Sequence, residues 1–338
     1  MVWIEHRPRD NLFFMSRLAA LLLVLLPWLV PACGGESSND RVVLTVRRGA
    51  VGPRVLIVVA HPDDEIAFAG AAYKTTTHLD GVVDLLTITN GEGGFKYSTL
   101  AEELYGLELT DEAIGRRHLP EIRRRELIEG CRQLRMHTIT FLSEVDHRYT
   151  QDPTEVLAPD AEVWDLERVR KRIDRALANG EYDFVLGLAP TATTHGHHQA
   201  ATILAAQAVA RMPQDERPAM LAVRSRRGTD ESPTLRANSH APEVTQPLEH
   251  PPLVFDRAQK FGHKDKLDYS IVANWAISAH KSQGTMQMYV GPASEEHYFA
   301  LAPTTPEALE RATAWIARLE EPQFEVRTYG ESAGSNAR

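Results

Sequence analysis

The chain has 338 residues, of which 43% are hydrophobic and 25% are charged. This balance is typical of a globular protein and supplies enough apolar residues for one large domain or two ordinary ones. A formal net charge of −9 argues against nucleic acid as the main partner, because phosphate binding needs a positive surface. With only two cysteines, Cys33 and Cys131, no disulfide framework supports the fold.

The N-terminal segment has the pattern of a secretory signal. A basic start at 15–17 precedes the apolar run 18–26, and a small residue precedes Cys33. The run is shorter than the ~20 residues of a membrane-spanning helix and is followed by two prolines, which favours a signal over an anchor. The small residue before Cys33 resembles a bacterial lipoprotein processing site. We therefore expect a signal over 1–33, a lipid on Cys33 and a lipid-anchored protein of the bacterial cell envelope.

The rest of the chain divides by composition and pattern into four parts. They are a tether with an edge segment (34–52), an α/β domain (53–223), an insertion with C-terminal helices that complete the same domain (224–325), and a disordered tail (326–338). The polar segment 95–118 is long for a loop and is expected to form a lid or a substrate-binding excursion. For residues 224–262, the sequence predicts no particular helix or strand.

Apolar strands alternate with amphipathic helices from residue 55 onward. The expected strands are Val55–Ala60, Val82–Thr89, His137–Leu142, Asp183–Leu188 and Pro218–Val223. The expected helices are Glu65–Thr77, Pro120–Leu134, Asp165–Gly180, one that ends near Arg211, Ser270–Gln283 and Thr305–Leu319. This rhythm indicates βαβ units. It predicts a Rossmann-like three-layer αβα sandwich with a mostly parallel sheet.

Two of the expected strands end in side chains that can bind a metal. The first is followed by His61, Asp63 and Asp64, and the fourth by His195, His197 and His198. In an open parallel sheet, ligands bind at the carboxyl ends of the strands. Imidazole and carboxylate groups without a nearby thiolate favour Zn²⁺ in a catalytic site. Two histidines and one carboxylate leave a position for a water molecule whose pKa falls toward ~7, and a second carboxylate can act as its general base.

Each half of this pattern also has a simpler interpretation. The His-Pro-Asp turn can cap the helix that follows it, and histidine clusters are common on protein surfaces. Both halves at one edge of a sheet favour a metal site. His280 is either a wall of that site or a residue on a helix surface, and the arginines around Arg123 are mostly typical of a solvated helix face.

The segment Ala60-His61-Pro62-Asp63-Asp64-Glu65, paired with the distal His195-x-x-His198, resembles the signature of the PIG-L/LmbE family of zinc-dependent N-acetylglucosamine deacetylases. The resemblance covers about residues 53–223, and Ala279–Gln283 resembles a further family element. It implies a hydrolase that removes the N-acetyl group from an N-acetylglucosamine-type sugar or glycoconjugate. A metal-bound water would attack the amide.

The resemblance also implies a role for individual residues. These are His61, Asp64 and His198 as zinc ligands, Asp63 as general base, His195 as the group that stabilises the oxyanion, and Arg123 and Asp146 near the sugar hydroxyls. The chain departs from the family pattern at Gly196 and His197, where a Pro-Asp or Gly-Asp pair is common. The acidic neighbour that orients the oxyanion histidine is therefore missing at that position.

Two other functions remain open at this point. The first is a zinc amidase or acyl hydrolase that acts on a different envelope substrate, and the second is a non-catalytic sugar-binding envelope lipoprotein. Because the signal and Cys33 point outside the cytoplasmic membrane, the expected substrate is an envelope or extracellular glycan, glycolipid or glycoconjugate.

Overall fold

The computed structural model describes residues 40–45, 49–226, 231, 233–288 and 295–324. The expected signal with Cys33, the first part of the tether and the expected tail lie outside the described residues. The chain divides into two units, Met1–Ser37 and Ser38–Arg338, and the fold below is that of the second unit. Across the described ranges, no helix is both long enough and apolar enough to span a membrane.

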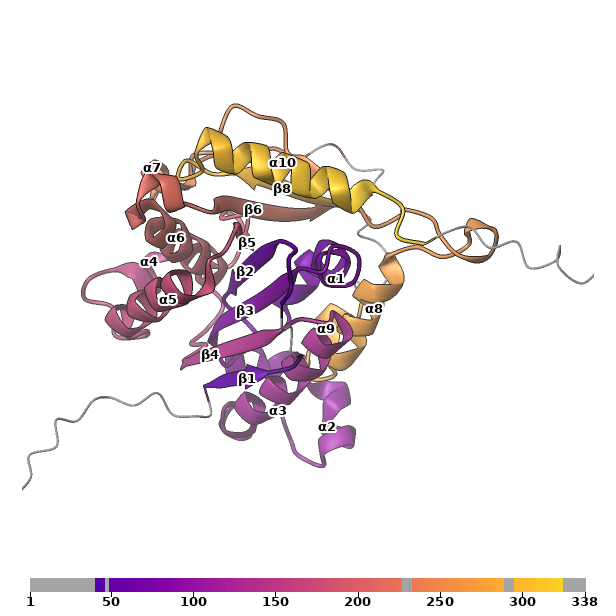
Figure 1. Cartoon of the computed structure of the whole chain (residues 1–338). Coiled ribbons are helices and arrows are strands. Elements are labelled where there is room, and N and C mark those ends of the chain that lie inside the picture. Colours follow the sequence, from indigo (N-terminus) through magenta and orange to yellow (C-terminus); the bar gives the residue numbers. More distant parts are fainter. Residues whose placement is uncertain (1–39, 46–48, 227–230, 232, 289–294, 325–338) are drawn as a thin grey trace, which may run out of the picture. The chain divides into compact units, whose positions relative to one another are not determined.

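One eight-stranded sheet organises this unit (Figure 1). The strands are β1 (Arg41–Val43), β2 (Arg54–Val59), β3 (Val82–Thr89), β4 (Thr138–Glu144), β5 (Phe184–Leu188), β6 (Ala219–Arg226), β7 (Leu253–Asp256) and β8 (Glu295–Ala300). Their order in the sheet is β1-β4-β3-β2-β5-β6-β8-β7. The neighbours from β4 to β6 pair in parallel, whereas β1, β7 and β8 pair antiparallel with their neighbours.

The sheet is therefore mixed, with a parallel centre and antiparallel edges. The prediction of a mostly parallel sheet describes its five central strands. At the edges, β1 lies within the expected edge segment 34–52, whereas β7 and β8 were not predicted. The central order β4-β3-β2-β5-β6 is that of a doubly wound sheet, in which the chain reverses its direction of winding between β2 and β5. Ligands bind in the crevice beyond the carboxyl ends of the strands at such a reversal.

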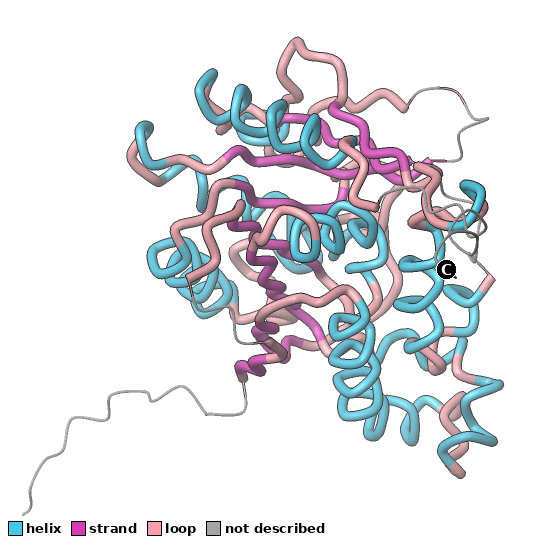
Figure 2. Tube along the Cα trace, turned by 45° about the vertical axis from the view of Figure 1, so that its right-hand side comes forward, coloured by secondary structure: helices cyan, strands magenta, loops and turns pink. Residues whose placement is uncertain are grey.

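Helices cover both faces of the sheet (Figures 1 and 2). The α-helices are α1 (Ala69–Thr77), α2 (Thr99–Tyr105), α3 (Glu112–Gln133), α4 (Thr154–Leu157), α5 (Leu166–Gly180), α6 (Gly196–Arg211), α7 (Pro242–Thr245), α8 (Ser270–Ala279), α9 (Gly284–Gln287) and α10 (Pro306–Glu320). Short 3₁₀ helices are η1 (Asp64–Phe68), η2 (Glu92–Tyr97), η3 (Gln214–Glu216) and η4 (His263–Asp265). Alternate residues of β2 enter two cores. Val55 and Ile57 pack with α1, α3, α8 and α10, and Leu56 and Val58 pack with α5 and α6.

Two helices begin where their capping residues predict. The Asp165 side chain accepts a hydrogen bond from the Arg168 N–H at the start of α5. Thr305 caps α10 in the same way, and Pro306 occupies its first turn. These caps satisfy N–H groups that have no partner inside the helix.

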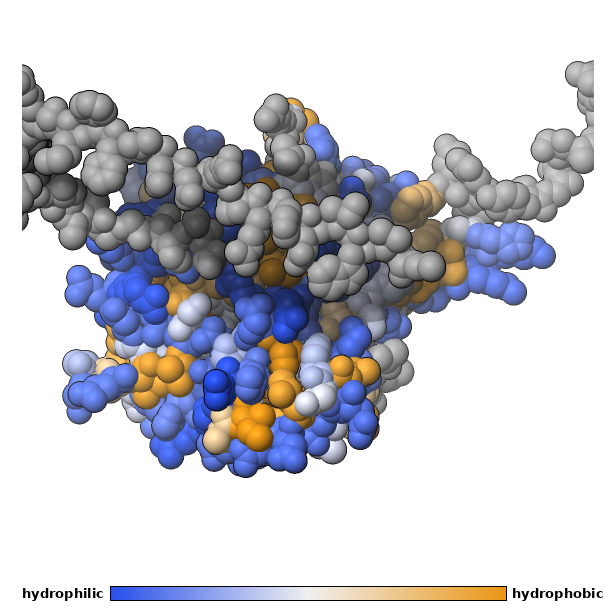
Figure 3. Space-filling view, turned by 90° about the horizontal axis from the view of Figure 1, so that it is seen from below, coloured by the Kyte–Doolittle hydropathy of each residue, from blue (hydrophilic) through white to orange (hydrophobic). Residues whose placement is uncertain are grey.

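Residues 95–118 are not a long loop, and the lid or substrate-binding excursion expected there stays a prediction. Helix α2 and the first turns of α3 fill this segment, and α3 begins at Glu112 because the Asp111 side chain caps it. Pro120, which marks a helix start in the sequence, lies inside α3, where buried Leu119 and its neighbours hold the helix against a small apolar cluster. Leu100 on α2 is 81% exposed. Apolar side chains are visible among hydrophilic ones on the lower face of the unit (Figure 3).

Residues 224–325 contribute more than helices to the domain. Strand β6 continues to Arg226, and β7 and β8 extend the sheet beyond it. Strand β8 was not predicted, because its sequence opens with Glu295 and Glu296 and lacks an apolar run. Glu296 is buried nonetheless, since its carboxylate accepts hydrogen bonds from the Gly70 N–H and the Arg257 guanidinium.

Candidate active site

The reversal between β2 and β5 brings the expected site residues together. His61, Asp63 and Asp64 follow β2, and His195 and His198 lie at the start of α6, after β5. Asp63 has a φ of 141°, a conformation that costs of the order of 1–3 kcal/mol for a residue with a side chain. The Asp64 carboxylate accepts a hydrogen bond of 2.8 Å from the His61 N–H, which helps to fix this turn.

His61, Asp64 and His198 form the first of two groups that can hold a metal ion. His198 Nε2 lies 2.9 Å from His61 Nδ1 and 3.1 Å from Asp64 Oδ1. His61 Nδ1 lies 3.7 Å from Asp64 Oδ2. Ligands at ~2.0–2.2 Å from a tetrahedral zinc ion lie about 3.3–3.6 Å from one another. The spacing and the donor set of two imidazoles and one carboxylate therefore fit such an ion.

The second group consists of His61, Asp146, His195 and His197. Asp146 Oδ1 lies 3.5 Å from His61 Nε2 and 3.3 Å from His197 Nδ1, and Asp146 Oδ2 accepts a hydrogen bond from the Gly93 N–H. His197 is fully buried and Asp146 is 5% exposed. A catalytic metal needs an open position. Of the four residues of the second group, only His195 is half-buried, and none of them lines the cavity beside Asp63 and Asp64.

The first group does offer an open position. Asp64 lines a cavity, and the His198 side chain is 22% exposed. Asp146 then lies behind His61, on the ring nitrogen that faces away from the first group. Metal-binding histidines commonly have a carboxylate in this place, where it orients the ring.

The electrostatics of the turn favour a positive charge within the first group. Burial disfavours the charged form of His61, but the carboxylates of Asp146, Asp64 and Asp63 outweigh burial and raise its pKa to about 9. Burial also disfavours ionised Asp64, yet His198 and His61 hold its pKa below the usual range. Carboxylates that stabilise a proton between the imidazoles can also stabilise a metal cation there.

Asp63 stands apart from the first group and pairs with Arg123. The Arg123 Nη2 lies 3.0 Å from Asp63 Oδ2 and also donates to the Pro62 carbonyl. Burial raises the pKa of Asp63, Arg123 opposes that shift and Asp64 adds to it, so that the net pKa is raised. A carboxylate with a raised pKa suits general base catalysis near neutral pH.

Arg123 itself is 2% exposed and donates to the Gly91 carbonyl as well. It does not line the cavity beside Asp63. The structure thus places Arg123 behind the carboxylate, and its expected role at the sugar hydroxyls stays a prediction. The same holds for Asp146, which contacts histidines instead.

His195 caps α6 with its ring. The His195 Nδ1 accepts a hydrogen bond of 3.0 Å from the His197 N–H, so the neutral ring carries its proton on Nε2. Burial, followed by the charges of His61, His197 and His198, lowers the pKa of His195 to about 3. The ring is therefore a neutral hydrogen-bond donor at neutral pH.

Asp146 also lies near His195, whose acidic neighbour is missing from the sequence. A carboxylate oxygen of Asp146 and a ring nitrogen of His195 belong to the same group, within 4.8 Å of each other. Asp146, which follows β4, therefore places a carboxylate near His195. Sequence reasoning also missed Tyr149, whose ring centroid lies 5.0 Å from that of His195 and whose side chain is exposed.

Glu65 and His280 form a buried pair behind this turn. His280 Nε2 lies 2.5 Å from Glu65 Oε1, and both side chains are fully buried. Burial lowers the pKa of His280, but Glu65 and then Asp63 reverse the shift and raise it. A Cβ added at Gly130 of α3 would lie 2.7 Å from Glu65 Oε1, so only glycine leaves room for the pair. Of the two alternatives for His280, the helix surface is therefore wrong.

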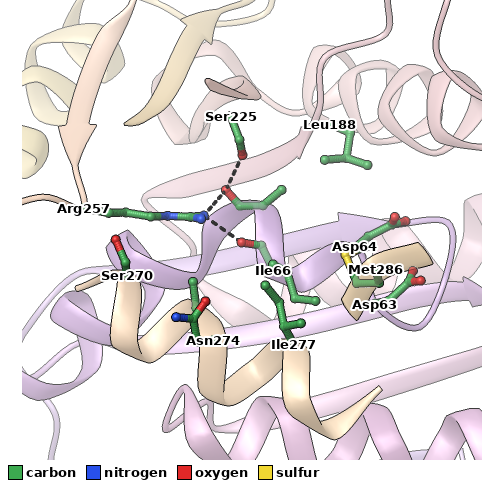
Figure 4. A pocket seen from close by; sticks show the side chains of 12 residues that line it. Asp63, Asp64, Ile66, Leu188, Ser225, Arg257, Ser270, Asn274, Ile277 and Met286 are labelled. Carbon is green, nitrogen blue, oxygen red and sulfur yellow. Dashed lines mark hydrogen bonds between the residues drawn. The ribbon is translucent and has the colours of Figure 1, made fainter. Parts of the chain in front are cut away.

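Two adjoining cavities lie beside η1, and the first of them also borders the turn. The first, of about 230 Å³, is lined by Asp63 and Asp64 together with mainly apolar side chains (Figure 4). The second, of about 260 Å³, is lined by three threonines of the loop after β5 and by Arg224. Both share Leu188 and Ser225. A substrate can therefore contact two surfaces of different polarity near the carboxylates.

Residues 56–209 match the model of the family described as PIG-L: GlcNAc-PI de-N-acetylase. The match covers somewhat less than half of the 338 residues. The matched PIG-L segment runs from β2 to α6 and contains Asp146 and both halves of the first metal-binding group. His280 and strands β6 to β8 lie beyond it.

Several solved structures are similar to this chain at low identity. N,N′-diacetylchitobiose deacetylase from Pyrococcus horikoshii is 18% identical, with a TM-score of 0.41 over 75% of this chain and 85% of that chain. The A40926 pseudoaglycone deacetylase Dbv21 is 15% identical (TM-score 0.43, 74% and 97%). GalB, the 4-carboxy-2-hydroxymuconate hydratase from Pseudomonas putida KT2440, is 13% identical (TM-score 0.44, 73% and 95%). A search of the curated proteins found no match.

Proposed function

We propose that this protein is a zinc-dependent hydrolase that removes the N-acetyl group from an N-acetylglucosamine-type sugar or glycoconjugate. The observation that carries the proposal is the triangle of His61, Asp64 and His198 with Asp63 beside it. This arrangement lies inside the segment that matches the PIG-L model. Adjacent carboxylates in different surroundings can divide the roles of ligand and base.

Zinc fits the donor set of the first group, since imidazole and carboxylate ligands with an open position are typical of catalytic zinc sites. A zinc ion held there would polarise the amide carbonyl and lower the pKa of a water molecule. Asp146 keeps the other nitrogen of His61 engaged. Asp64 is also held by the His61 N–H, so the ligand geometry is set before substrate binds.

The remaining chemistry belongs to Asp63 and His195. Asp63 accepts a proton from the attacking water and then gives it to the amine, as the carbonyl carbon gains an oxygen and the C–N bond breaks. Arg123 holds Asp63 in place during both transfers. The Nε2–H of His195 donates a hydrogen bond to the oxygen that becomes negative in the transition state. The products are acetate and the free amino sugar.

Acetate release from N-acetylglucosamine derivatives tests this proposal. Purified protein is expected to release acetate, to lose this activity with a chelator and to regain it with added Zn²⁺. The activity should depend on the metal because, without it, nothing at the three proposed ligands polarises the amide carbonyl or lowers the pKa of the attacking water. Zinc-loaded protein that releases acetate from no amino sugar would contradict the proposal and favour a sugar-binding lipoprotein.

We also propose that the protein acts in the bacterial cell envelope, anchored by a lipid on Cys33. The support is the signal pattern of 1–33 in the sequence. In a bacterial host, a labelled fatty acid is expected to enter the wild-type protein and not the Cys33→Ala variant. Equal labelling of both proteins would contradict this location.

A further inference from the structure

We propose that the enzyme prefers amino sugars whose N-acyl group is an aliphatic chain longer than acetyl, and that this chain occupies the cavity beside Asp63 and Asp64. The inference rests on the proposed function, because it assigns the acyl side of the same amide. N-acetyl is then the shortest member of the substrate series.

The walls of this cavity are mainly apolar. The apolar lining residues come from η1, the end of β5, α8 and α9, and are Ile66, Ala67, Leu188, Ala273, Ile277 and Met286. Ser225, Arg257, Ser270 and Asn274 also line the cavity, on the side away from Asp63 and Asp64. Figure 4 shows Asp63, Asp64 and Met286 at one side of the cavity, and Arg257, Ser270 and Asn274 toward the other. A hydrocarbon chain would be removed from water by such walls, whereas sugar hydroxyls would lose their hydrogen bonds there.

The charged group at the far side does not attract an anion. The Arg257 Nε lies 2.6 Å from Glu296 Oε1, and its Nη2 donates to the Ile66 and Ala67 carbonyls. These acceptors neutralise or engage the Arg257 guanidinium beside the cavity. The Ser225 hydroxyl likewise donates to the Ala67 carbonyl. The cavity therefore lacks an open charge for a phosphate or carboxylate.

The size of the cavity also exceeds what acetyl needs. An apolar cavity of about 150 Å³ can hold a benzene molecule, and this one measures about 230 Å³. The single methyl group of acetyl would leave most of that space empty. A chain of several carbons fills it, and each buried methylene can improve binding about fourfold.

The position of the cavity assigns it to the acyl chain and not to an aglycone. Asp63 and Asp64, which flank the reacting carbon in the proposed mechanism, both line it. The acyl chain is bonded directly to that carbon, whereas an aglycone begins one sugar ring farther away. The adjoining cavity, with the hydroxyls of Thr191, Thr193 and Thr194, has the polar groups that a sugar ring requires.

A substrate series tests the proposal. N-acetyl-, N-butyryl-, N-hexanoyl- and N-octanoylglucosamine are compared by kcat/KM, beside alkyl glycosides of N-acetylglucosamine with the same added carbons. We expect kcat/KM to rise at least about 10-fold from acetyl to hexanoyl and to stay within about 3-fold along the alkyl glycosides. A flat acyl series, or a rise confined to the alkyl glycosides, overturns the proposal.

Variants locate the effect. Ala273→Phe fills the cavity from α8 and should bring the hexanoyl-to-acetyl ratio of kcat/KM close to one. Ser278→Phe introduces the same side chain at an exposed position of the same helix and should keep the wild-type ratio. Met286→Ala enlarges the cavity at a half-buried position and should shift the optimum to longer chains, so the test stands even if Ala273→Phe does not fold. An unchanged ratio in folded Ala273→Phe, or an unchanged optimum in Met286→Ala, contradicts the proposal.

The proposed function and the acyl-chain preference are contradicted by different results. Hydrolysis of N-acetylglucosamine derivatives with no gain along the acyl series leaves the proposed function intact and removes the acyl-chain preference. Absence of hydrolysis at every chain length, in protein shown to contain zinc, removes both.

Discussion

Replacement of Asp63 by Asn is expected to lower kcat about 10²- to 10⁴-fold while the protein keeps its zinc. Asn has the shape of Asp but cannot accept a proton, and a positioned general base contributes an acceleration of about that size. Asp63 is not a member of the group His61, Asp64 and His198 that would hold the zinc ion. Steady-state kinetics and metal analysis of the same preparation check both halves of this expectation.

The Asp63→Asn result needs a control for the lost charge. Asp160→Asn makes the same change at an exposed position and should retain wild-type kcat and zinc. Arg123 keeps the Pro62 and Gly91 carbonyls as acceptors in Asp63→Asn, so the variant should still fold. A folded Asp63→Asn protein without zinc would mean that Asp63 is the ligand and Asp64 the base.

Replacement of His198 by Asn is expected to abolish stable zinc binding and, with it, acetate release. The loss of one of three protein ligands leaves only His61 and Asp64, and an amide oxygen or nitrogen is a poor substitute for imidazole. Removal of an outer partner of a ligand typically costs only about 10- to 100-fold in affinity. Zinc affinity measured by competition with a coloured chelator should therefore fall by much more than 100-fold.

His197→Asn provides the matched comparison, because His197 is a neighbour of His198 and belongs only to the second group. His197→Asn removes a partner of Asp146, which contacts the ligand His61. Its zinc affinity should therefore fall by no more than about 10- to 100-fold. The reverse ranking, with zinc lost from His197→Asn and kept by His198→Asn, would assign the metal to the second group.

The sequence alone could locate the reacting groups because the fold places them by simple rules. An apolar run without alternation indicates a strand buried on both faces, and two such strands carry their ligands to one edge. Because His195 and His198 are three residues apart at the start of a helix, they lie on the same face of that helix. Both inferences depend on local periodicity, which a single sequence displays.

The orientation of those groups could not be predicted, because it depends on contacts between distant segments. Asp146 follows β4 and His61 follows β2. The two residues meet because β4 lies beside β3, two strands from β2 in the sheet. Arg123 on α3 pairs with Asp63 after β2, although the sequence around Arg123 is typical of a solvated helix face. Strand β8 begins with two acidic residues that have distant partners: Glu296 pairs with N–H groups of α1 and with Arg257 after β7, and Glu295 pairs with Arg226 of β6.

The buried pair of Glu65 and His280 has a consequence for how the protein is made. Its two members are 215 residues apart, and Glu296 reaches back over 226 residues to the Gly70 N–H. On the ribosome, where N-terminal segments emerge first, the turn that carries Asp63 and Asp64 appears long before either partner. A carboxylate such as Glu65 stays in water until its partner arrives, since burial of an unpaired charge is strongly unfavourable. The segment with Asp63 and Asp64 is therefore made well before the residues that hold it, and the candidate site takes its final geometry only after Glu65 and Gly70 have met partners from the last quarter of the chain.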